Sequence, residues 1–318
     1  MNINNNCLPK ITVLLANPRG FCAGVERAIE IVNRVLLKYK PPIYVNHEIV
    51  HNSYVIQKLK KRGVIFVNKI SEVPNYSVII FSAHGVSHKI EKESKLKHLK
   101  IIDATCPLVK KVHIQGKRFE EDAKKIILIG HKGHPEVQST KGRLNQKVFI
   151  VETLQDIDNI PYSQKDHISY ITQTTLSVDD TKKIISNIKM KFPNIQGPNI
   201  DHICYATQNR QNTVKKIALV ADTIFVIGAK NSSNSNRLYE IAKNYGINSY
   251  LLEGKDDKIK DLLMNTRVLG ITAGASTPEI LIHRLVKRIT MLRSVKIINV
   301  SGIKENVKFT IPKSLLNV

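Results

Sequence analysis

The sequence lacks several features that would assign it to a protein class at once. Its 318 residues contain no uninterrupted apolar run near the roughly 20 residues that a membrane span requires. Residues 1–7 lack the basic and apolar regions of a signal peptide. Hydrophobic residues make up 42% of the chain, which is enough for a proper core. We therefore expect a soluble, cytoplasmic protein with two or three domains or with repeated units.

Cysteine is also scarce, and its spacing excludes common metal sites. The four cysteines are Cys7, Cys22, Cys106 and Cys204, with no Cys-x-x-Cys pair among them. That absence excludes zinc-finger and zinc-ribbon spacings, and disulfides are not expected in a cytoplasmic protein. Buried free cysteine is common, so the count alone predicts no site.

Acidic residues are outnumbered by basic ones, 26 to 49, which gives a net charge of +23. Such an excess suits phosphate backbones, so a nucleic-acid-binding module is one alternative. The basic residues, however, fall in short runs at 58–62, 124–125 and 182–191 that are typical of solvated helix faces. We expect no nucleic-acid partner; the charge would instead aid the capture of an anionic substrate.

One sequence plan occurs three times: an apolar strand, a cysteine in a polar loop, then a helical pattern. It covers residues 11–39, 101–113 and 201–218, with strands expected at 11–15, 101–105 and 201–203. Pro107 suits a first helical position, which predicts Cys106 at a helix N-cap. Cys7 has no counterpart in this plan, and we interpret it as structurally incidental.

Each of the three cysteines is followed at a nearly constant distance by further strands that end in polar loops. Equivalent loop residues, His51, His134 and Ser232, lie 29, 28 and 28 positions after their cysteines. A last strand and loop then closes each unit at 81–85, 172–175 and 272–276. A fixed internal period of this kind indicates repeated structural units.

Alternating strands and helices predict parallel sheets, in which ligands bind beyond the carboxyl ends of the strands. We expect an α/β fold of three pseudo-repeated α/β units around an approximate threefold axis, with the loops pointing into a central cavity. The expected segments are an N-terminal strand with the first cysteine loop (1–22), three α/β units (23–105, 106–203 and 204–297) and a C-terminal tail (298–318).

Three thiolates from equivalent loops can hold three irons of a cubane cluster and leave the fourth iron open for catalysis. Two alternatives remain: three buried thiols at helix starts, and a zinc ion bound by three cysteines, which ligand softness does not separate from iron and sulfur.

The remaining loops carry donors for an anion rather than carboxylates. Imidazole, hydroxyl, amide and backbone N–H groups before helices all favour phosphate oxygens. Each residue taken alone is better explained by an N-cap or a turn, but their shared placement at strand ends favours an anion site instead. These residues are His51, His84, His134, Ser232, Ser233, Asn234 and Ser276.

Glu136 is the acidic residue of these loops that is placed for chemistry. It follows Pro135 in a His-rich loop, so it either interacts with the dipole of the following helix or supplies protons to the substrate.

Six runs together resemble the 4-hydroxy-3-methylbut-2-enyl diphosphate reductase family. The resemblance extends from about residue 11 to 312, and no functional position of the family departs from its pattern. The runs are ANPRGFCAGV (16–25), DATCP (103–107), GHKGHPE (130–136), TQTTLS (172–177), NSSNSN (231–236) and TAGAS (272–276).

The resemblance implies the last step of the non-mevalonate isoprenoid pathway, in which an allylic hydroxyl is removed to give isopentenyl and dimethylallyl diphosphates. It implies one 4Fe-4S cluster per chain on Cys22, Cys106 and Cys204, with the substrate hydroxyl at the fourth iron. Glu136 would relay protons, and Thr174, with Thr175, would contact the hydroxyl. The diphosphate would be held by His51, His84, His134, Ser232, Ser233, Asn234 and Ser276.

No Gly-x-Gly-x-x-Gly fingerprint is present, so electrons are expected from a separate flavodoxin- or ferredoxin-like donor rather than from a bound nicotinamide. A rival of another class is a non-redox hydratase or dehydratase, which would need no reductant.

Overall fold

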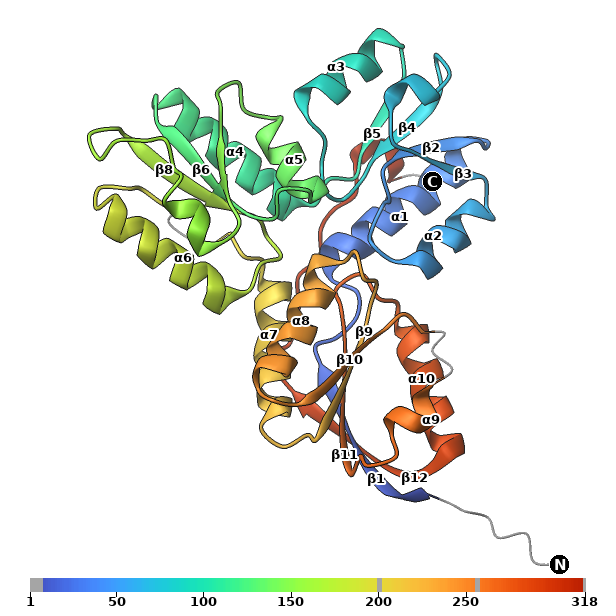
Figure 1. The fold of residues 1–318 in the computed structure, drawn as a ribbon. Helices are drawn as coiled ribbons and strands as arrows, with labels where there is room; N and C mark the ends of the chain where they lie inside the picture. Colours follow the sequence, from blue (N-terminus) through green and yellow to red (C-terminus); the bar gives the residue numbers. More distant parts are fainter. Residues whose placement is uncertain (1–7, 199–201, 255–257, 317–318) are drawn as a thin grey trace, which may run out of the picture. The chain divides into compact units, whose positions relative to one another are not determined.

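The computed structural model describes residues 8–198, 202–254 and 258–316 (Figure 1). Cys7 lies outside these residues. Every strand pairing between the named strands is parallel, in three separate sheets. The expected α/β fold with three parallel sheets is therefore confirmed, whereas the threefold axis, the central cavity and the segment boundaries stay predictions.

The three sheets share a pattern in which one strand lies between the next two strands of the chain. The first has the order β3-β2-β4-β5, from β2 (Ile43–Asn46), β3 (Val64–Val67), β4 (Val78–Phe81) and β5 (Lys100–Asp103). The second has the order β7-β6-β8, from β6 (Lys125–Ile129), β7 (Phe149–Val151) and β8 (Ile168–Thr172). The third has the order β10-β9-β11-β1-β12, from β1 (Leu8–Asn17), β9 (Thr223–Ile227), β10 (Asn248–Leu252), β11 (Val268–Ala273) and β12 (Arg293–Ser301).

Ten α-helices are assigned within the described residues. With the first sheet come α1 (Ala23–Lys38), α2 (Ser53–Lys60) and α3 (His88–Leu96). With the second come α4 (Pro107–Glu121), α5 (Pro135–Lys141) and α6 (Val178–Lys191). With the third come α7 (Tyr205–Ala218), α8 (Ser233–Asn244), α9 (Ile259–Leu262) and α10 (Glu279–Leu292). Short 3-10 turns occur at Ile70–Glu72, Leu154–Ile157 and Lys313–Leu315.

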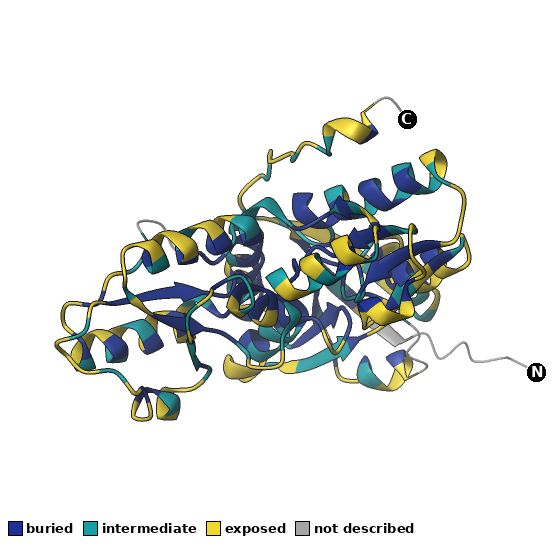
Figure 2. Ribbon diagram, turned by 90° about the horizontal axis from the view of Figure 1, so that it is seen from above, coloured by how far each residue is buried: buried dark blue, intermediate teal, exposed yellow. Residues whose placement is uncertain are grey.

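The sequence pattern explains why these elements form. The inner strands are continuous runs of Ile, Val and Leu, such as Ile126–Ile129, which are 0–1% exposed because helices cover both faces of a parallel sheet. In α1, Ala28, Ile31, Val32 and Val35 lie on one buried stripe with helical spacing. Figure 2 shows the same division, with dark blue strands and helices banded in blue and yellow.

The chain forms two compact units. The first, called here the one-sheet unit, contains the chain up to Cys22, residues 51–53 and residues 205–307, with the third sheet. The second, called the two-sheet unit, contains residues 23–50, 54–204 and the chain from Lys308, with the first and second sheets.

The sequence pattern predicted a strand before Cys204, at 201–203, and this prediction is wrong. Residue 201 lies outside the described residues, and residues 202–203 form a bend. Gln196 instead occupies the position beside β8, since Tyr170 N–H donates to its carbonyl at 2.9 Å and its own N–H donates to Ile168 at 3.0 Å. Pro198 has no N–H to extend this pairing into a ladder.

The third sheet joins the strand nearest the start of the described chain to strands from its last third. The N-terminal strand β1 lies between β11 and β12 and pairs in parallel with both. β12 spans Arg293–Ser301, so the boundary expected at residues 297 and 298 falls inside a strand. The sequence pattern gave no signal for this strand, which is mostly exposed at the sheet edge.

Candidate active site

The predicted site residues follow two adjacent, paired strands in each sheet. The pairs are β2 with β4, β6 with β8, and β9 with β11. The connection that follows the first strand of a pair crosses the sheet in one direction, and the connection that follows the second strand crosses it in the other. Such a reversal is the point at which open α/β sheets bind ligands beyond the carboxyl ends of their strands. His51 and His84 follow the first pair, His134, Glu136, Thr174 and Thr175 the second, and Ser232, Ser233, Asn234 and Ser276 the third.

The three cysteines make the same backbone contact. Each donates its N–H to the carbonyl of a residue in the loop after β4, β8 or β11. The contacts are Cys22 to Ala275 at 3.1 Å, Cys106 to Ala83 at 3.0 Å and Cys204 to Thr174 at 2.9 Å. The threefold repeat read from the sequence therefore has a structural counterpart at each cysteine.

The cysteines have the chemistry that a thiolate-bound metal needs. All three are partly exposed and outside disulfides, and each directly precedes a helix, α1, α4 or α7. A helix N-terminus favours the negatively charged thiolate. Cys106 is the N-cap of α4 with Pro107 at the first helical position, as the sequence predicted.

Arg27 adds positive charge beside Cys106. Burial lowers the pKa of this guanidinium, and attraction from Asp103 and Cys106 opposes that shift. A thiolate near a fixed cation is favoured further, so the donor set fits a cysteine-bound metal group.

The three thiols are divided between the units. Cys22 belongs to the one-sheet unit, and Cys106 and Cys204 belong to the two-sheet unit. Within the part of the chain that the structure describes, no group of three or more His, Cys, Asp or Glu side chains could hold a metal ion. The meeting of the three thiols at one group stays a prediction.

Glu136 is buried in the two-sheet unit and bound by Thr174. The side chain is 2% exposed, and the Thr174 N–H and hydroxyl donate to its two carboxylate oxygens at 2.7 and 2.9 Å. Burial raises the pKa of Glu136 to about 7, against the opposing effect of the Thr174 hydrogen bonds. A carboxyl group with this pKa exchanges its proton near neutral pH, as a general acid must.

Two predicted histidines meet in the same unit. The rings of His84 and His134 lie edge to face, with centroids 5.7 Å apart. The Glu136 N–H donates to Nδ1 of His134 at 3.1 Å, so the neutral imidazole carries its proton on Nε2. His84 is fixed through its carbonyl, which accepts the Ser139 hydroxyl at 2.7 Å.

The one-sheet unit brings together a second set of predicted donors. Ser232 is the N-cap of α8, and its side chain accepts a hydrogen bond from the Ser235 N–H, so the structural alternative predicted for it holds. Asn234 accepts the Ala275 N–H at 2.8 Å and donates to Thr207 at 3.3 Å. The Ser276 hydroxyl donates to the His51 carbonyl at 2.8 Å, so the loops after β9, β11 and β2 meet here.

Comparison with known proteins decides the family. The family model described as LytB protein matches residues 13–290. The chain belongs to the LytB family. A curated relative from Buchnera aphidicola is 50% identical over 311 residues, covering 97% of this chain and 98% of its own length. One from Nitrosomonas europaea is 48% identical over 313 residues, covering 96% and 97%. Both are named 4-hydroxy-3-methylbut-2-enyl diphosphate reductase.

Two solved structures agree with the fold. The reductase structure from Plasmodium falciparum has a TM-score of 0.93 and 39% identity, covering 97% of this chain and 98% of that one. A second structure, titled as the terminal enzyme of the non-mevalonate pathway, has a TM-score of 0.63 and 34% identity, covering 88% and 99%. The resemblance read from the six sequence runs is thereby confirmed.

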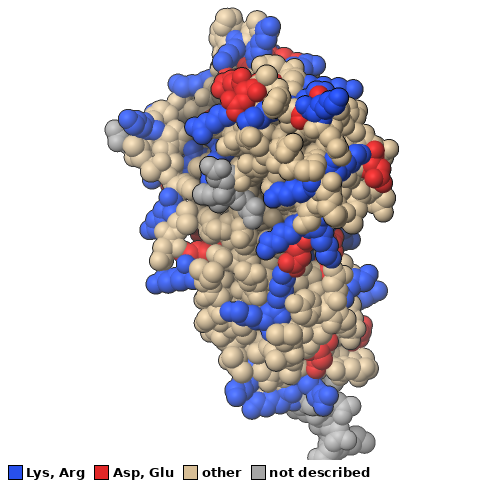
Figure 3. Space-filling model, turned by 90° about the vertical axis from the view of Figure 1, so that its left-hand side faces the viewer, with Lys and Arg blue, Asp and Glu red and all other residues tan. Residues whose placement is uncertain are grey.

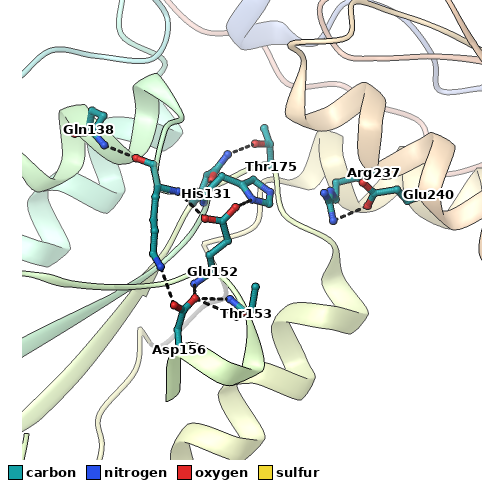
Figure 4. Close-up of polar contacts among 10 residues, drawn as sticks. His131, Gln138, Glu152, Thr153, Asp156, Thr175, Arg237 and Glu240 are labelled. Atoms are coloured by element: carbon teal, nitrogen blue, oxygen red, sulfur yellow. Dashed lines mark hydrogen bonds and ion pairs between the residues drawn. The ribbon is translucent and has the colours of Figure 1, made fainter. Parts of the chain in front are cut away.

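A polar network that includes His131, Glu152 and Thr175 was not predicted from the sequence of this LytB chain (Figure 4). The Gln173 amide accepts the His131 N–H at 3.0 Å and donates to the Thr175 hydroxyl at 2.9 Å. The His131 ring contacts Glu152 at 3.0 Å, and Lys132 pairs with Asp156 at 2.7 Å. The available signal was the position of Gln173, directly after β8 and between two polar neighbours.

On one face of the LytB chain the positive charge is dispersed. Figure 3 shows Lys and Arg spread over the face in view with Asp and Glu between them, rather than gathered in one patch. None of the helices within residues 8–198, 202–254 and 258–316 combines the length and the apolar character that crossing a bilayer requires.

Proposed function

We propose that this chain reduces (E)-4-hydroxy-3-methylbut-2-enyl diphosphate to isopentenyl diphosphate and dimethylallyl diphosphate, the last step of the non-mevalonate isoprenoid pathway. The observation that carries the proposal is the buried Glu136–Thr174 pair, in a chain that matches reductase-named relatives over nearly its full length. The reaction consumes two electrons and two protons, and the hydroxyl oxygen leaves as water.

The proposal assigns one 4Fe-4S cluster per chain to Cys22, Cys106 and Cys204. Their position before helices and their repeated N–H contacts support equivalent roles. When bound, the cluster would supply electrons and one Lewis-acidic iron with an open position.

Donors at the strand ends would hold the diphosphate. The Nε2–H of His134 is a donor in the neutral tautomer, and protonation of the imidazoles would add charge. Seven residues are assigned to this role: His51, His84, His134, Ser232, Ser233, Asn234 and Ser276.

Glu136 would protonate the leaving oxygen, because hydroxide is a poor leaving group. Its pKa of about 7 supports this role, since the group is then both protonated often enough and acidic enough near neutral pH. Thr174 and Thr175 would contact the substrate hydroxyl, and Thr174 also holds the carboxyl group in place through two hydrogen bonds.

Electrons would come from a separate flavodoxin- or ferredoxin-like protein. We propose that the protein acts in the cytoplasm. We expect it to bind neither nucleic acid nor a membrane. The face drawn in Figure 3 supports this, because its basic residues are interspersed with acidic ones rather than gathered in one patch.

Anaerobic reconstitution with iron and sulfide, followed by assay with reduced viologen and the hydroxymethylbutenyl diphosphate, tests the proposal. We expect both isoprenoid diphosphates to form only when reductant is present. Conversion without reductant would indicate a dehydratase instead. Failure to convert, combined with steeply salt-dependent binding to any DNA duplex, would favour a nucleic-acid-binding module.

A further inference from the structure

The loop that carries Cys22 donates backbone hydrogen bonds to the end of β11 and to the loop after it. The N–H groups of Gly20 and Cys22 donate to the carbonyls of Ala273 and Ala275, at 3.3 and 3.1 Å. Gly20 has a φ of +67°, and a Cβ there would lie 3.0 Å from the Thr277 carbonyl. This close approach requires glycine.

Backbone carbonyls of the same loop accept hydrogen bonds from Arg210 of α7. This side chain is 1% exposed, and its Nε and Nη2 donate to the Gly20 carbonyl at 3.2 and 2.9 Å. Nη2 also reaches the Phe21 carbonyl at 3.4 Å. Gly20 is thus bound through both its N–H and its carbonyl, and Phe21 through its carbonyl, within one unit.

Glu305, in the stretch after β12, is the counterion of this buried guanidinium. Nη1 of Arg210 lies 3.0 and 3.2 Å from its two carboxylate oxygens, and Nη2 lies 3.3 Å from one of them. Asn209 adds a hydrogen bond of 3.1 Å to the same carboxylate. A buried guanidinium with no counterion is strongly destabilising, so Glu305 keeps Arg210 in place.

The two-sheet unit has a similar contact at Cys106, made by an arginine that is only partly buried. Arg27 of α1 donates to the carbonyl of Thr105, the residue before Cys106, at 3.2 Å. Its Nε donates to the Thr310 carbonyl of the C-terminal stretch at 2.7 Å. Arg27, in the helix after Cys22, thus links the Cys106 loop to Thr310. Arg210, in the helix after Cys204, links the Cys22 loop to Glu305.

We propose that Arg210, held by Glu305, is a positioning residue that fixes the Cys22 loop in the geometry for binding its metal group. The inference rests on the proposed function only in taking Cys22 as a ligand. A ligand whose loop is already ordered loses less conformational freedom on binding, and supporting hydrogen bonds commonly control metal affinity.

Arg293 offers a matched control. It is 3% exposed, belongs to the same unit, and donates to two backbone carbonyls, those of Leu263 and Thr266, at 2.8 and 2.7 Å. It therefore resembles Arg210 in burial and bonding but holds a different segment.

The first measurement uses metal-free protein and does not depend on the cluster. Hydrogen exchange of the Gly20 and Cys22 amides should be about 10-fold faster or more in Arg210→Met, with the strands β9 and β11 unchanged. Arg293→Met should leave the Cys22 loop at the wild-type rate. If Arg210→Met does not fold, Glu305→Gln, which removes only the charge, should show a smaller acceleration at the same two amides. The proposal would be overturned if both amides of the folded variant exchanged at the wild-type rate. It would also be overturned if Arg293→Met accelerated their exchange as much as Arg210→Met does.

The second measurement follows reconstitution with iron and sulfide. Arg210→Met should lose iron to a chelator about 10-fold faster or more than wild type, and Arg210→Lys should recover little because lysine lacks the forked donors. Faster amide exchange with wild-type iron retention would overturn the positioning role. If the wild-type protein binds no iron while the exchange of its Cys22 loop still depends on Arg210, the cluster assignment is wrong. The role of Arg210 in ordering the loop is then retained.

Discussion

Thr174 donates two hydrogen bonds to the carboxylate of Glu136, one from its N–H at 2.7 Å and one from its hydroxyl at 2.9 Å. The carbonyl of Thr174 accepts the Cys204 N–H at 2.9 Å. One residue of the loop after β8 therefore links the buried acid to a candidate ligand loop. A displacement of this loop would disturb both.

Glu136→Gln tests the proton relay. Glutamine keeps the size and the position at the start of α5 but cannot cycle a proton, so turnover should fall on the order of 100-fold or more with iron content and substrate binding preserved. A helix-dipole role would cost only about 0.3–1 kcal/mol of stability. Glu91, in the first turn of α3, gives the matched control Glu91→Gln, which should turn over normally. Normal turnover in Glu136→Gln would remove the relay.

The raised pKa of Glu136 predicts a pH dependence of stability. Because burial raises the pKa from 4.5 to about 7, the folded chain keeps a proton that the unfolded chain loses in this window, and stability falls as the pH rises through it. Relative to Glu136→Gln, the wild-type protein should lose up to roughly 3 kcal/mol of unfolding free energy between about pH 4 and pH 8. Urea unfolding of the two metal-free proteins measures this. Parallel curves would show that the carboxyl group is not desolvated.

Serine substitutions test the ligand assignment. Cys22→Ser, Cys106→Ser and Cys204→Ser should each lose most of the cluster absorbance and activity, because a hydroxyl is a poor substitute for a thiolate. Cys7→Ser should keep both. Iron and sulfide per chain, measured anaerobically, decide the matter, and full cluster content in any of the first three variants would remove that cysteine from the set.

Donor removal tests the diphosphate site. Ser232→Ala and His84→Asn should each weaken substrate binding by roughly 1.5–3 kcal/mol, since each removes a hydrogen bond to a charged group. Ser232 also caps α8, so Ser177→Ala, which removes the equivalent cap of α6, is the control for capping alone. Dissociation constants measured with the cluster intact separate the effects. Unchanged affinity in both site variants would place the diphosphate elsewhere.

Local sequence was sufficient for the repeated features of this protein. The Ile-rich runs, the turn residues after them and Pro107 predicted the parallel strands, the loops and the N-cap at Cys106 because each depends on neighbours in the chain. The same signals located the histidine and serine loops at strand ends. The strand expected at 201–203 was wrong, because a single residue, Gln196, fills that position in the sheet.

Only the tertiary structure decided which of these pieces touch. Thr174 and Glu136 lie 38 residues apart, and Arg210 lies 190 residues from the carbonyl of Gly20. No periodicity encodes such pairs, since they form when separate strands align in one sheet and a helix folds back over a loop. The placement of β1 beside β11 is of the same kind, because hydrogen bonds between parallel strands join segments from opposite ends of the chain. The sequence thus determined the chemical groups and their local settings, whereas sheet pairing and burial decided their partners and the raised pKa of Glu136.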